Sequence, residues 1–289
     1  MAHLKTSAMK TKNLVWSLLM ILLSFGICSA QSNDYPFKVK ISGNGAKNLI
    51  FIPGFMSSVD VWNETIGELS STYKCYTIQF DGFAGQPAQG EPSLSNWKAS
   101  LATYIQKEKI KNPIIIGHSL GGVMALDLAS TYPDLMQSIV VVDALPSLSA
   151  AFNPNFKVQE NLDCTDIIMQ FTGLTDEQFK TMQEQTAGSM STIPEKQKEI
   201  VNWSLKSDRE ASAKIFCEFN NTDLRAQLAK AKVPALIMLN SRFGQMKEGI
   251  NSQYTAYANK DIQYAPSPTH FLMFDAKDWY LTQLRNFIK

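Results

Sequence analysis

The stretch that decides the fold is Pro113-Ile114-Ile115-Ile116-Gly117-His118-Ser119-Leu120-Gly121-Gly122. Its β-branched run predicts a buried strand, and apolar residues from Leu120 to Tyr132 recur at helical spacing. Gly117 and Gly121 flank Ser119 in the pattern G-x-S-x-G, in which a serine sits on a strained strand-to-helix turn with no room for neighbouring side chains. The stretch therefore predicts a strand, a sharp turn and a helix, with Ser119 as the candidate nucleophile.

The first thirty residues have the pattern of a secretory signal peptide. Two lysines precede an apolar run from Leu14 to Ile27, and Cys28-Ser29-Ala30 supplies small residues for cleavage. Because the run is shorter than the roughly 20 residues of a membrane span, we expect residues 1–30 to be removed. The mature protein is then periplasmic or secreted, without a stable membrane span. A lipid anchor on Cys28 is an alternative, disfavoured because Ile27 before it is not small.

Length and charge narrow the function classes. Without the predicted leader of residues 1–30, the rest of the 289-residue chain has a length that suits one α/β domain with an insertion better than two independent domains. The chain carries 27 Lys plus Arg against 26 Asp plus Glu, and no basic cluster stands out, so we expect no nucleic-acid or polyanion partner. Without a C-x-x-C motif or a histidine cluster, we also expect no metal and no cofactor.

Three cysteines remain after the predicted leader. Cys75 lies in an apolar strand pattern and is expected to be buried and free. Cys164 and Cys217 both fall in the region assigned below to an inserted cap. Their pairing in a disulfide is an open alternative at this point, since an exported protein permits it.

The order of the elements predicts a doubly wound, mostly parallel sheet of the α/β class. Strand and helix patterns alternate along the chain, and the strands are continuously apolar, as in sheets that are covered on both faces. After the first strand, Gly43-Asn44-Gly45 predicts a turn that reverses the chain. Strands are expected at 37–42, 48–52, 75–80, 114–116, 138–142, 233–239 and 261–265, and helices at 57–71, 94–107, 120–132, 224–231, 247–257 and 275–288.

The α/β alternation is interrupted by a region that carries only helical patterns. Between Pro146 and about Asn221 there is no strand signal, and Thr175-Asp176-Glu177-Gln178 is typical of a capping box. We therefore divide the chain into residues 31–145 and 222–289 as the two parts of the core, and residues 146–221 as a helical cap. Cap helices are expected at 164–171, 175–185, 194–205 and 208–219.

Histidines are scarce, which limits the choice of a general base. After the leader the chain holds only His118 and His270. His118 directly precedes Ser119 on the turn, where geometry makes it a poor base for the neighbouring hydroxyl. His270 lies in a loop after the last strand, above the carboxyl ends of the sheet, where open α/β folds bind their ligands. His270 is therefore the candidate general base.

At these residues the chain resembles the α/β-hydrolase superfamily, over residues 37–289. The resemblance rests on Gly117-His118-Ser119-Leu120-Gly121-Gly122, on Phe51-Ile52-Pro53-Gly54-Phe55 and on His270 before the final helix. It implies the chain order serine, acid, histidine, and an oxyanion hole made by the backbone N–H groups of Leu120 and Phe55. Pro53 stands where many relatives carry a histidine. Because the implied oxyanion donors are backbone N–H groups, this replacement does not remove them.

The acid is the least determined member of the implied triad. Many relatives carry it after the strand equivalent to Leu236-Ile237-Met238-Leu239, but Asn240 to Met246 contains no carboxylate. Asp143 ends the preceding strand, where some relatives place their acid, and is our prediction. Glu248 is the alternative, brought inward by an extended loop. Asp275 and Asp278 are expected at the start of the last helix, favourable to its dipole.

The predicted function is a serine hydrolase that cleaves a small, apolar acyl ester through an acyl-enzyme on Ser119, as a carboxylesterase-like enzyme (EC 3.1.1). The cap is the expected lid, and a few of its large apolar side chains are expected to face the substrate while most pack against each other. These are Phe152, Phe156, Met169, Phe171, Phe179, Met182, Met190, Trp203, Phe216 and Phe219.

Other functions stay open on the sequence alone. Within the hydrolases, an enzyme similar to proline iminopeptidases and a carbon–carbon hydrolase are alternatives. A ligand-binding protein of the same fold with little or no turnover is the alternative outside enzymes. A dehalogenase is disfavoured, because Ser119 stands where that chemistry needs an aspartate. The expected partner is a small-molecule acyl substrate, and the sequence does not indicate an oligomeric state.

Overall fold

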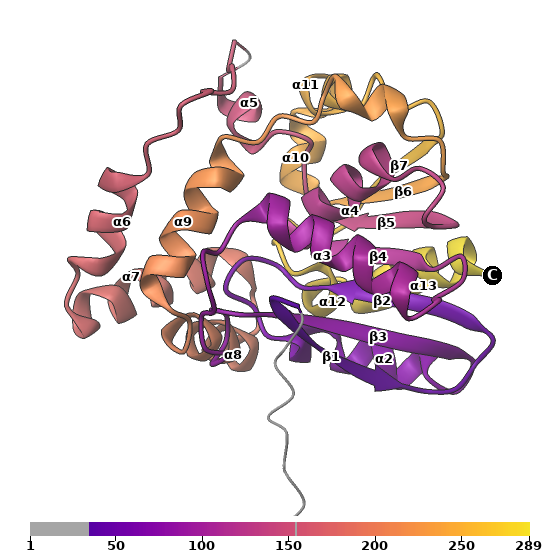
Figure 1. Ribbon diagram of the computed structural model, residues 1–289, viewed down its shortest axis with the longest axis horizontal. Coiled ribbons are helices and arrows are strands. Elements are labelled where there is room, and N and C mark those ends of the chain that lie inside the picture. Colours follow the sequence, from indigo (N-terminus) through magenta and orange to yellow (C-terminus); the bar gives the residue numbers. More distant parts are fainter. Residues whose placement is uncertain (1–34, 154) are drawn as a thin grey trace, which may run out of the picture. The chain divides into compact units, whose positions relative to one another are not determined.

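The computed structural model describes residues 35–153 and 155–289, so the predicted leader and its cleavage site lie outside the described residues. Seven strands form one sheet in the order β1-β3-β2-β4-β5-β6-β7 (Figure 1). β1 runs antiparallel to β3, and every other neighbouring pair is parallel. The predicted fold class is therefore confirmed. The strands are β1 (Phe37–Ser42), β2 (Lys47–Ile52), β3 (Tyr73–Phe80), β4 (Ile114–His118), β5 (Ser138–Val142), β6 (Ala235–Leu239) and β7 (Lys260–Tyr264).

The chain reverses at Gly43-Asn44-Gly45 as expected, because β1 runs antiparallel to β3 and β2 runs parallel to it, but β1 and β2 do not pair as a hairpin. β1 pairs with β3, from Phe37 opposite Phe80 to Ser42 opposite Cys75, and β3 separates it from β2. The burial patterns explain this order. The apolar part of β2 is buried and lies between two parallel neighbours, whereas β1 leaves Lys38, Lys40 and Ile41 exposed, as suits an edge strand.

Helices cover both faces of the sheet. One face is packed by α3 (Leu94–Lys107), α4 (Leu120–Thr131) and α11 (Lys247–Gln253). The other is packed by the 3₁₀ helix η1 (Val59–Trp62), α2 (Asn63–Leu69), α12 (Leu272–Asp275) and α13 (Lys277–Ile288). Two short elements flank β6, namely η2 (Gln227–Lys230) and α10 (Ser241–Gln245). Within the described residues, no helix combines the length and the apolar character needed to cross a bilayer.

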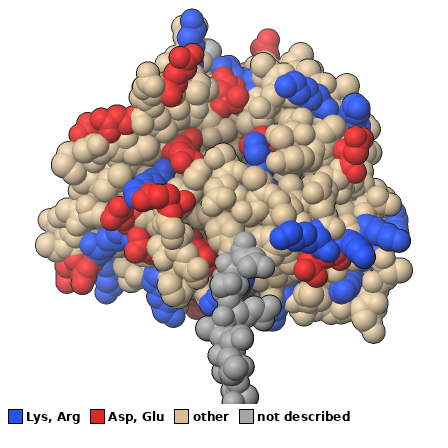
Figure 2. All heavy atoms as spheres, in the orientation of Figure 1, with Lys and Arg blue, Asp and Glu red and all other residues tan. Residues whose placement is uncertain are grey.

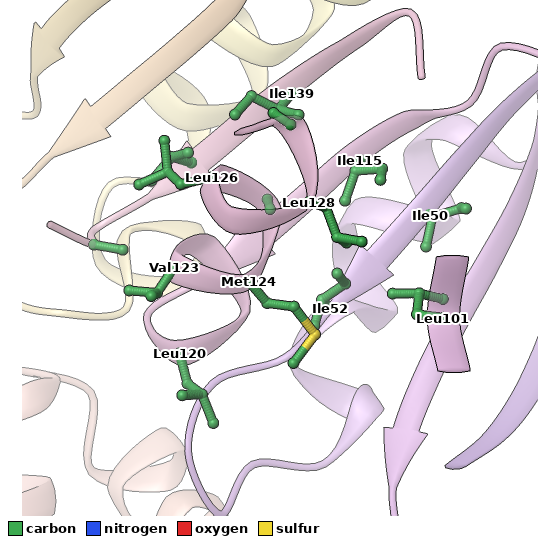
Figure 3. Close-up of a cluster of buried hydrophobic side chains, with 14 of the residues drawn as sticks. Ile50, Ile52, Leu101, Ile115, Leu120, Val123, Met124, Leu126, Leu128 and Ile139 are labelled. Atoms are coloured by element: carbon green, nitrogen blue, oxygen red, sulfur yellow. The ribbon is translucent and has the colours of Figure 1, made fainter. Parts of the chain in front are cut away.

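Helix α4 is the most deeply buried helix of the core. Figure 3 shows Met124 and Leu128 of α4 pointing toward Ile52 of β2 and Ile115 of β4. Ten of its residues are buried, so the helix is apolar on almost every side. Because this packing holds α4 rigidly against β2, β4 and β5, the turn that opens α4 is held in a fixed position over the sheet.

Between β5 and β6 the described residues form five α-helices and no strand. They are α5 (Leu148–Phe152), α6 (Thr165–Thr172), α7 (Asp176–Met190), α8 (Pro194–Leu205) and α9 (Arg209–Asn220), of which α6 to α9 lie beside one end of the sheet (Figure 1). The capping box predicted at Thr175 is present at the start of α7. A disulfide joins Cys164 to Cys217, which settles the pairing that the sequence left open, and Cys75 is buried and free as expected.

Asp275 does not lie at the start of the final helix, where the sequence placed it. It ends the short helix α12, and its carboxylate accepts hydrogen bonds from the backbone N–H and the hydroxyl of Thr192. Thr192 connects α7 to α8, so this contact ties the cap to the segment after His270. Asp278 does lie in the first turn of α13, as expected.

Candidate active site

Ser119 lies between the last residue of β4 and the first residue of α4, with backbone angles φ 53° and ψ −119°. A positive φ is unfavourable for a residue with a side chain, so the surrounding structure must impose it. Close packing explains the two glycines. A Cβ atom on Gly117 would lie 2.0 Å from the Gly121 carbonyl oxygen, and one on Gly121 would lie 2.3 Å from the Ile52 carbonyl oxygen. The turn therefore presents Ser119 through backbone contacts that only glycine permits.

The candidate base and acid are in contact. His270 lies in the loop between β7 and α12, and its Nδ1 is 2.6 Å from Oδ2 of Asp143. Asp143 directly follows β5, has a φ of 51° and is 2% exposed. With Asp143 ionised, Nδ1 is the donor of this hydrogen bond, which leaves Nε2 of neutral His270 as an acceptor. The backbone N–H of His270 donates to the Met190 carbonyl in the cap, at 3.0 Å.

Ser119 and His270 face the same space. Both side chains line each of the two cavities described below. In the described part of the chain, no hydrogen bond joins the Ser119 hydroxyl to His270. Catalytic hydrogen bonds are often long before substrate binds, so the arrangement is compatible with proton transfer between the two side chains.

Asn240 is a site residue that the sequence analysis missed. It follows β6, the strand beside β5, and its backbone N–H donates to Asp143 Oδ1 at 2.7 Å. Its side-chain Nδ2 donates to both carboxylate oxygens, at 2.9 and 2.8 Å. The Asp143 carboxylate thus accepts from Asn240 and His270 together. The sequence signal that could have identified Asn240 was its position directly after a predicted strand, since the carboxyl ends of parallel strands meet at one edge of the sheet.

Glu248, the alternative acid, is placed differently. It lies in helix α11 with an exposed side chain and lines neither cavity. The segment before it forms the short helix α10 rather than an extended loop. Asp143, not Glu248, accepts the hydrogen bond that His270 Nδ1 donates.

His118 is buried beneath the site. Its Nε2 lies 3.1 Å from the His270 carbonyl oxygen, so Nε2 carries the proton and donates. Burial lowers the pKa of His118 well below its ordinary value, and the neighbouring His270 adds to the effect. The ring packs against Phe271 at 4.6 Å and edge-on to Trp62 at 6.5 Å, between ring centroids. His118 is therefore a neutral support of the loop that carries His270.

The predicted oxyanion donors lie on two sides of the turn. Phe55 lines both cavities, and Leu120 is the first residue of α4. Within residues 35–153 and 155–289, neither backbone N–H donates to a protein acceptor. A Cβ atom on Gly54 would lie 2.9 Å from His118 Nδ1 and 3.2 Å from Ser119 Cβ. The glycine therefore lets the segment that carries Phe55 approach Ser119 closely.

Two cavities meet at Ser119. The first has a volume of about 300 Å³ and the second about 500 Å³, and both are lined mainly by apolar side chains. Several predicted cap residues line them, whereas Phe179 and Trp203 are buried in the packing. Five residues line both cavities and mark their junction: Phe55, Ser119, Met190, Phe216 and His270.

Charge around the site is sparse. Within the described ranges, no group of three or more His, Cys, Asp or Glu side chains could hold a metal ion. On the molecular face drawn in Figure 2, basic and acidic side chains are interspersed rather than gathered by sign. The arrangement at Ser119 is thus a hydroxyl, an imidazole and a buried carboxylate at an apolar cavity, which is the set of groups used in acyl transfer.

Comparisons with known proteins give the same fold. The family model described as "alpha/beta hydrolase fold" matches residues 47–198. A pimeloyl-[acyl-carrier protein] methyl ester esterase from Wigglesworthia glossinidia brevipalpis is 31% identical over 111 residues, 38% of this chain and 41% of that protein. The chain thus spans about two fifths of the length of the curated relatives it matches.

Solved structures extend the likeness to most of the chain. The enol-lactonase from Burkholderia xenovorans LB400 has a TM-score of 0.72 at 15% identity, covering 87% of this chain and 96% of that chain. An esterase from Exiguobacterium antarcticum has a TM-score of 0.71 at 15% identity, covering 87% and 94%. At these identities the likeness shows the fold alone.

Proposed function

Because this chain belongs to the alpha/beta hydrolase fold family, we propose that it is a serine esterase that cleaves small, apolar acyl esters through an acyl-enzyme on Ser119. The observation that carries the proposal is the geometry around the nucleophile. Ser119 is held at positive φ at the junction of two apolar cavities, beside a histidine whose Nδ1 is bonded to a buried aspartate. This set of groups suits nucleophilic attack on a carbonyl carbon.

The first half-reaction forms the acyl-enzyme. His270 Nε2 removes the Ser119 hydroxyl proton while Oγ attacks the ester carbonyl carbon. The backbone N–H groups of Leu120 and Phe55, which have no acceptor in the described protein, stabilise the oxyanion. When the tetrahedral intermediate collapses, its bond to the alcohol oxygen breaks and the alcohol takes the proton from His270.

The second half-reaction returns the free enzyme. His270 takes a proton from a water molecule, whose oxygen attacks the acyl carbon. When this second tetrahedral intermediate collapses, the bond between the acyl carbon and Ser119 Oγ breaks, the acid leaves, and Oγ takes the proton back from His270. Asp143 orients the imidazole and stabilises its protonated form in both halves, and Asn240 holds the carboxylate in turn.

The cavities support an apolar substrate. Phe171, Met182 and Phe216 line the first cavity together with residues of the core. One half of the substrate fits in each cavity, since the ester carbonyl must lie at their junction near Ser119. The name of the methyl ester esterase that is 31% identical over 111 residues supports an ester bond as the target.

Export is part of the same proposal. The leader pattern of residues 1–30 lies outside the described residues, and the disulfide between Cys164 and Cys217 supports an oxidising compartment. Expression of the full gene in a bacterial host, followed by fractionation and N-terminal sequencing, tests this step. We expect a mature protein that begins at Gln31, whereas an uncleaved chain in the cytoplasm contradicts export.

A fluorophosphonate probe tests the enzyme assignment directly. We expect covalent labelling of the wild-type protein, and loss of labelling in Ser119→Ala. Turnover of p-nitrophenyl hexanoate should fall by a factor of about 10⁴ or more in this variant, because no other residue supplies the nucleophile. A folded wild-type protein that neither reacts with the probe nor hydrolyses any ester favours a ligand-binding protein instead. A preference for acetate esters over esters of longer acyl groups would contradict the proposal that the apolar cavities bind the substrate.

A further inference from the structure

The second cavity contains one charge that the mechanism does not use. Its lining residues include two charged side chains besides the histidine, Asp143 and Arg242. Asp143 is buried and engaged by His270 and Asn240. Arg242 has an exposed side chain at the cavity, among apolar neighbours such as Leu148 and Phe243.

Arg242 differs from the other three arginines of the chain. Arg209 pairs with Asp176 at 2.7 Å, Arg225 with Asp223 at 2.6 Å, and Arg285 with Glu68. Among the residues that the structure describes, Arg242 has no carboxylate partner and its side chain makes no hydrogen bond. A guanidinium that is always charged and offers several donors is thus left available at the cavity that Ser119 also lines.

The position of Arg242 is fixed relative to the catalytic groups. It is the second residue of α10, and its backbone N–H donates to the side chain of Asn240 at 2.9 Å. The same Asn240 side chain contacts Asp143, which contacts His270. Two hydrogen-bonded steps therefore connect the Arg242 backbone to the Asp143 carboxylate, so the backbone that carries the guanidinium is held at the second cavity.

The rim around Arg242 is apolar and open. Phe152 is 78% exposed and Met246 is 47% exposed, and both line the second cavity. Exposed apolar side chains that gather at one groove often mark a ligand-binding site. Together with Arg242 they form a surface that suits a substrate with an apolar body and a negatively charged end.

We propose that Arg242 binds a carboxylate at the end of the substrate that lies in the second cavity, which makes the natural substrate an anionic ester rather than a fully neutral one. The inference rests on the proposed esterase function and specifies its substrate class. A carboxylate matches one guanidinium in charge and can accept two parallel hydrogen bonds from it. A phosphate monoester carries nearly two charges, which one arginine neutralises only in part.

The test compares charged and neutral esters in pairs. On the acyl side the pair is mono-4-nitrophenyl adipate and 4-nitrophenyl hexanoate, and on the leaving-group side it is 3-carboxy-4-nitrophenyl hexanoate and 4-nitrophenyl hexanoate. For each pair, the ratio of kcat/KM for the charged to the neutral ester is measured in the wild type and in Arg242→Gln. Comparing ratios between proteins cancels the intrinsic reactivity of each ester.

We expect the charged-to-neutral ratio to fall about fivefold in Arg242→Gln for one of the two pairs, the size typical of an exposed ion pair. The pair that responds identifies which half of the substrate occupies the second cavity. The KM of that charged ester should also rise with salt in the wild type, since exposed charges are screened. Arg285→Gln, which removes an arginine bound to Glu68, is the matched control and should keep both wild-type ratios.

Two results would overturn the inference. In the first, neither charged-to-neutral ratio changes between the wild type and Arg242→Gln, while Ser119→Ala abolishes turnover of the neutral ester. The esterase proposal then stands and the carboxylate site is wrong. If the wild type hydrolyses neither pair, the esterase proposal fails, and the carboxylate site fails with it. Arg242→Lys is a further check. We expect it to keep part of the charged-to-neutral ratio that Arg242→Gln loses, because lysine keeps the charge but not the planar fork.

Discussion

Replacing Asp143 with asparagine separates the acid predicted here from its alternative. The carboxylate accepts four hydrogen bonds: two from Asn240 on Oδ1, one from Asn240 on Oδ2 and one from His270 on Oδ2. An asparagine side chain has one oxygen and one NH₂ group, so it cannot accept on both sides. Either orientation therefore turns an NH₂ group toward a donor.

The two orientations have different costs. With the NH₂ group toward His270, Nδ1 must accept a hydrogen bond, so the imidazole takes the tautomer with its proton on Nε2. In this tautomer Nε2 cannot accept the Ser119 proton. With the NH₂ group toward the Asn240 backbone N–H, a buried donor loses its acceptor, which costs about 1–3 kcal/mol of folding free energy. The first orientation avoids the clash with the immobile backbone, so we expect the wrong tautomer to dominate.

The expected loss in kcat is about 10⁴-fold, or about 5.5 kcal/mol of transition-state stabilisation, as for a serine hydrolase triad with the wrong tautomer. The assay is steady-state hydrolysis of p-nitrophenyl hexanoate, with circular dichroism and thermal melting to show that the variant folds. Glu248→Gln is the matched control and should keep kcat within about twofold, because Glu248 is exposed on α11. A folded Asp143→Asn protein with more than about a tenth of wild-type kcat refutes the reasoning, as does a large loss in Glu248→Gln.

Two further predictions concern stability. Asp81 is 3% exposed, neither of its carboxylate oxygens has a partner among the described residues, and burial raises its pKa while Lys38 opposes the shift. Because the pKa of Asp81 is raised in the folded state, its contribution destabilises the wild type increasingly as pH rises. Asp81→Asn should therefore raise the melting temperature more at pH 8 than at pH 4. An equal rise at both pH values would contradict the buried charge as the cause of the stabilisation. Opening the Cys164–Cys217 disulfide, which spans 53 residues, should lower the unfolding free energy by up to about 4 kcal/mol. Denaturant titration with and without reductant measures this loss, and Cys164→Ser should not respond to reductant.

Much of the site could be predicted because its constraints are local. The turn at Ser119 requires small residues at positions 117 and 121, since backbone carbonyls lie where their Cβ atoms would be. Such a steric requirement appears in the sequence as a pattern of glycines. The scarcity of histidine then selected His270, and the end of a buried strand selected Asp143.

Other features could not be predicted because they depend on which strands become neighbours. Asn240 contacts Asp143 across 97 residues, and His270 contacts it across 127, through the adjacency of β5 and β6 and the loop after β7. The pairing of β1 with β3 could not be predicted for the same reason, since a local turn signal does not say which strands become neighbours in the sheet.

The sequence by itself determined the α/β class, the strained turn under Ser119 and the identity of the candidate base, because backbone sterics and hydrophobic periodicity act over a few residues. Only the tertiary structure decided which carboxylate reaches His270, that Asn240 supports it, and that an unpaired arginine borders the cavity. These depend on side chains brought together from distant parts of the chain, whose spacing follows from the packing of the whole sheet and its cap.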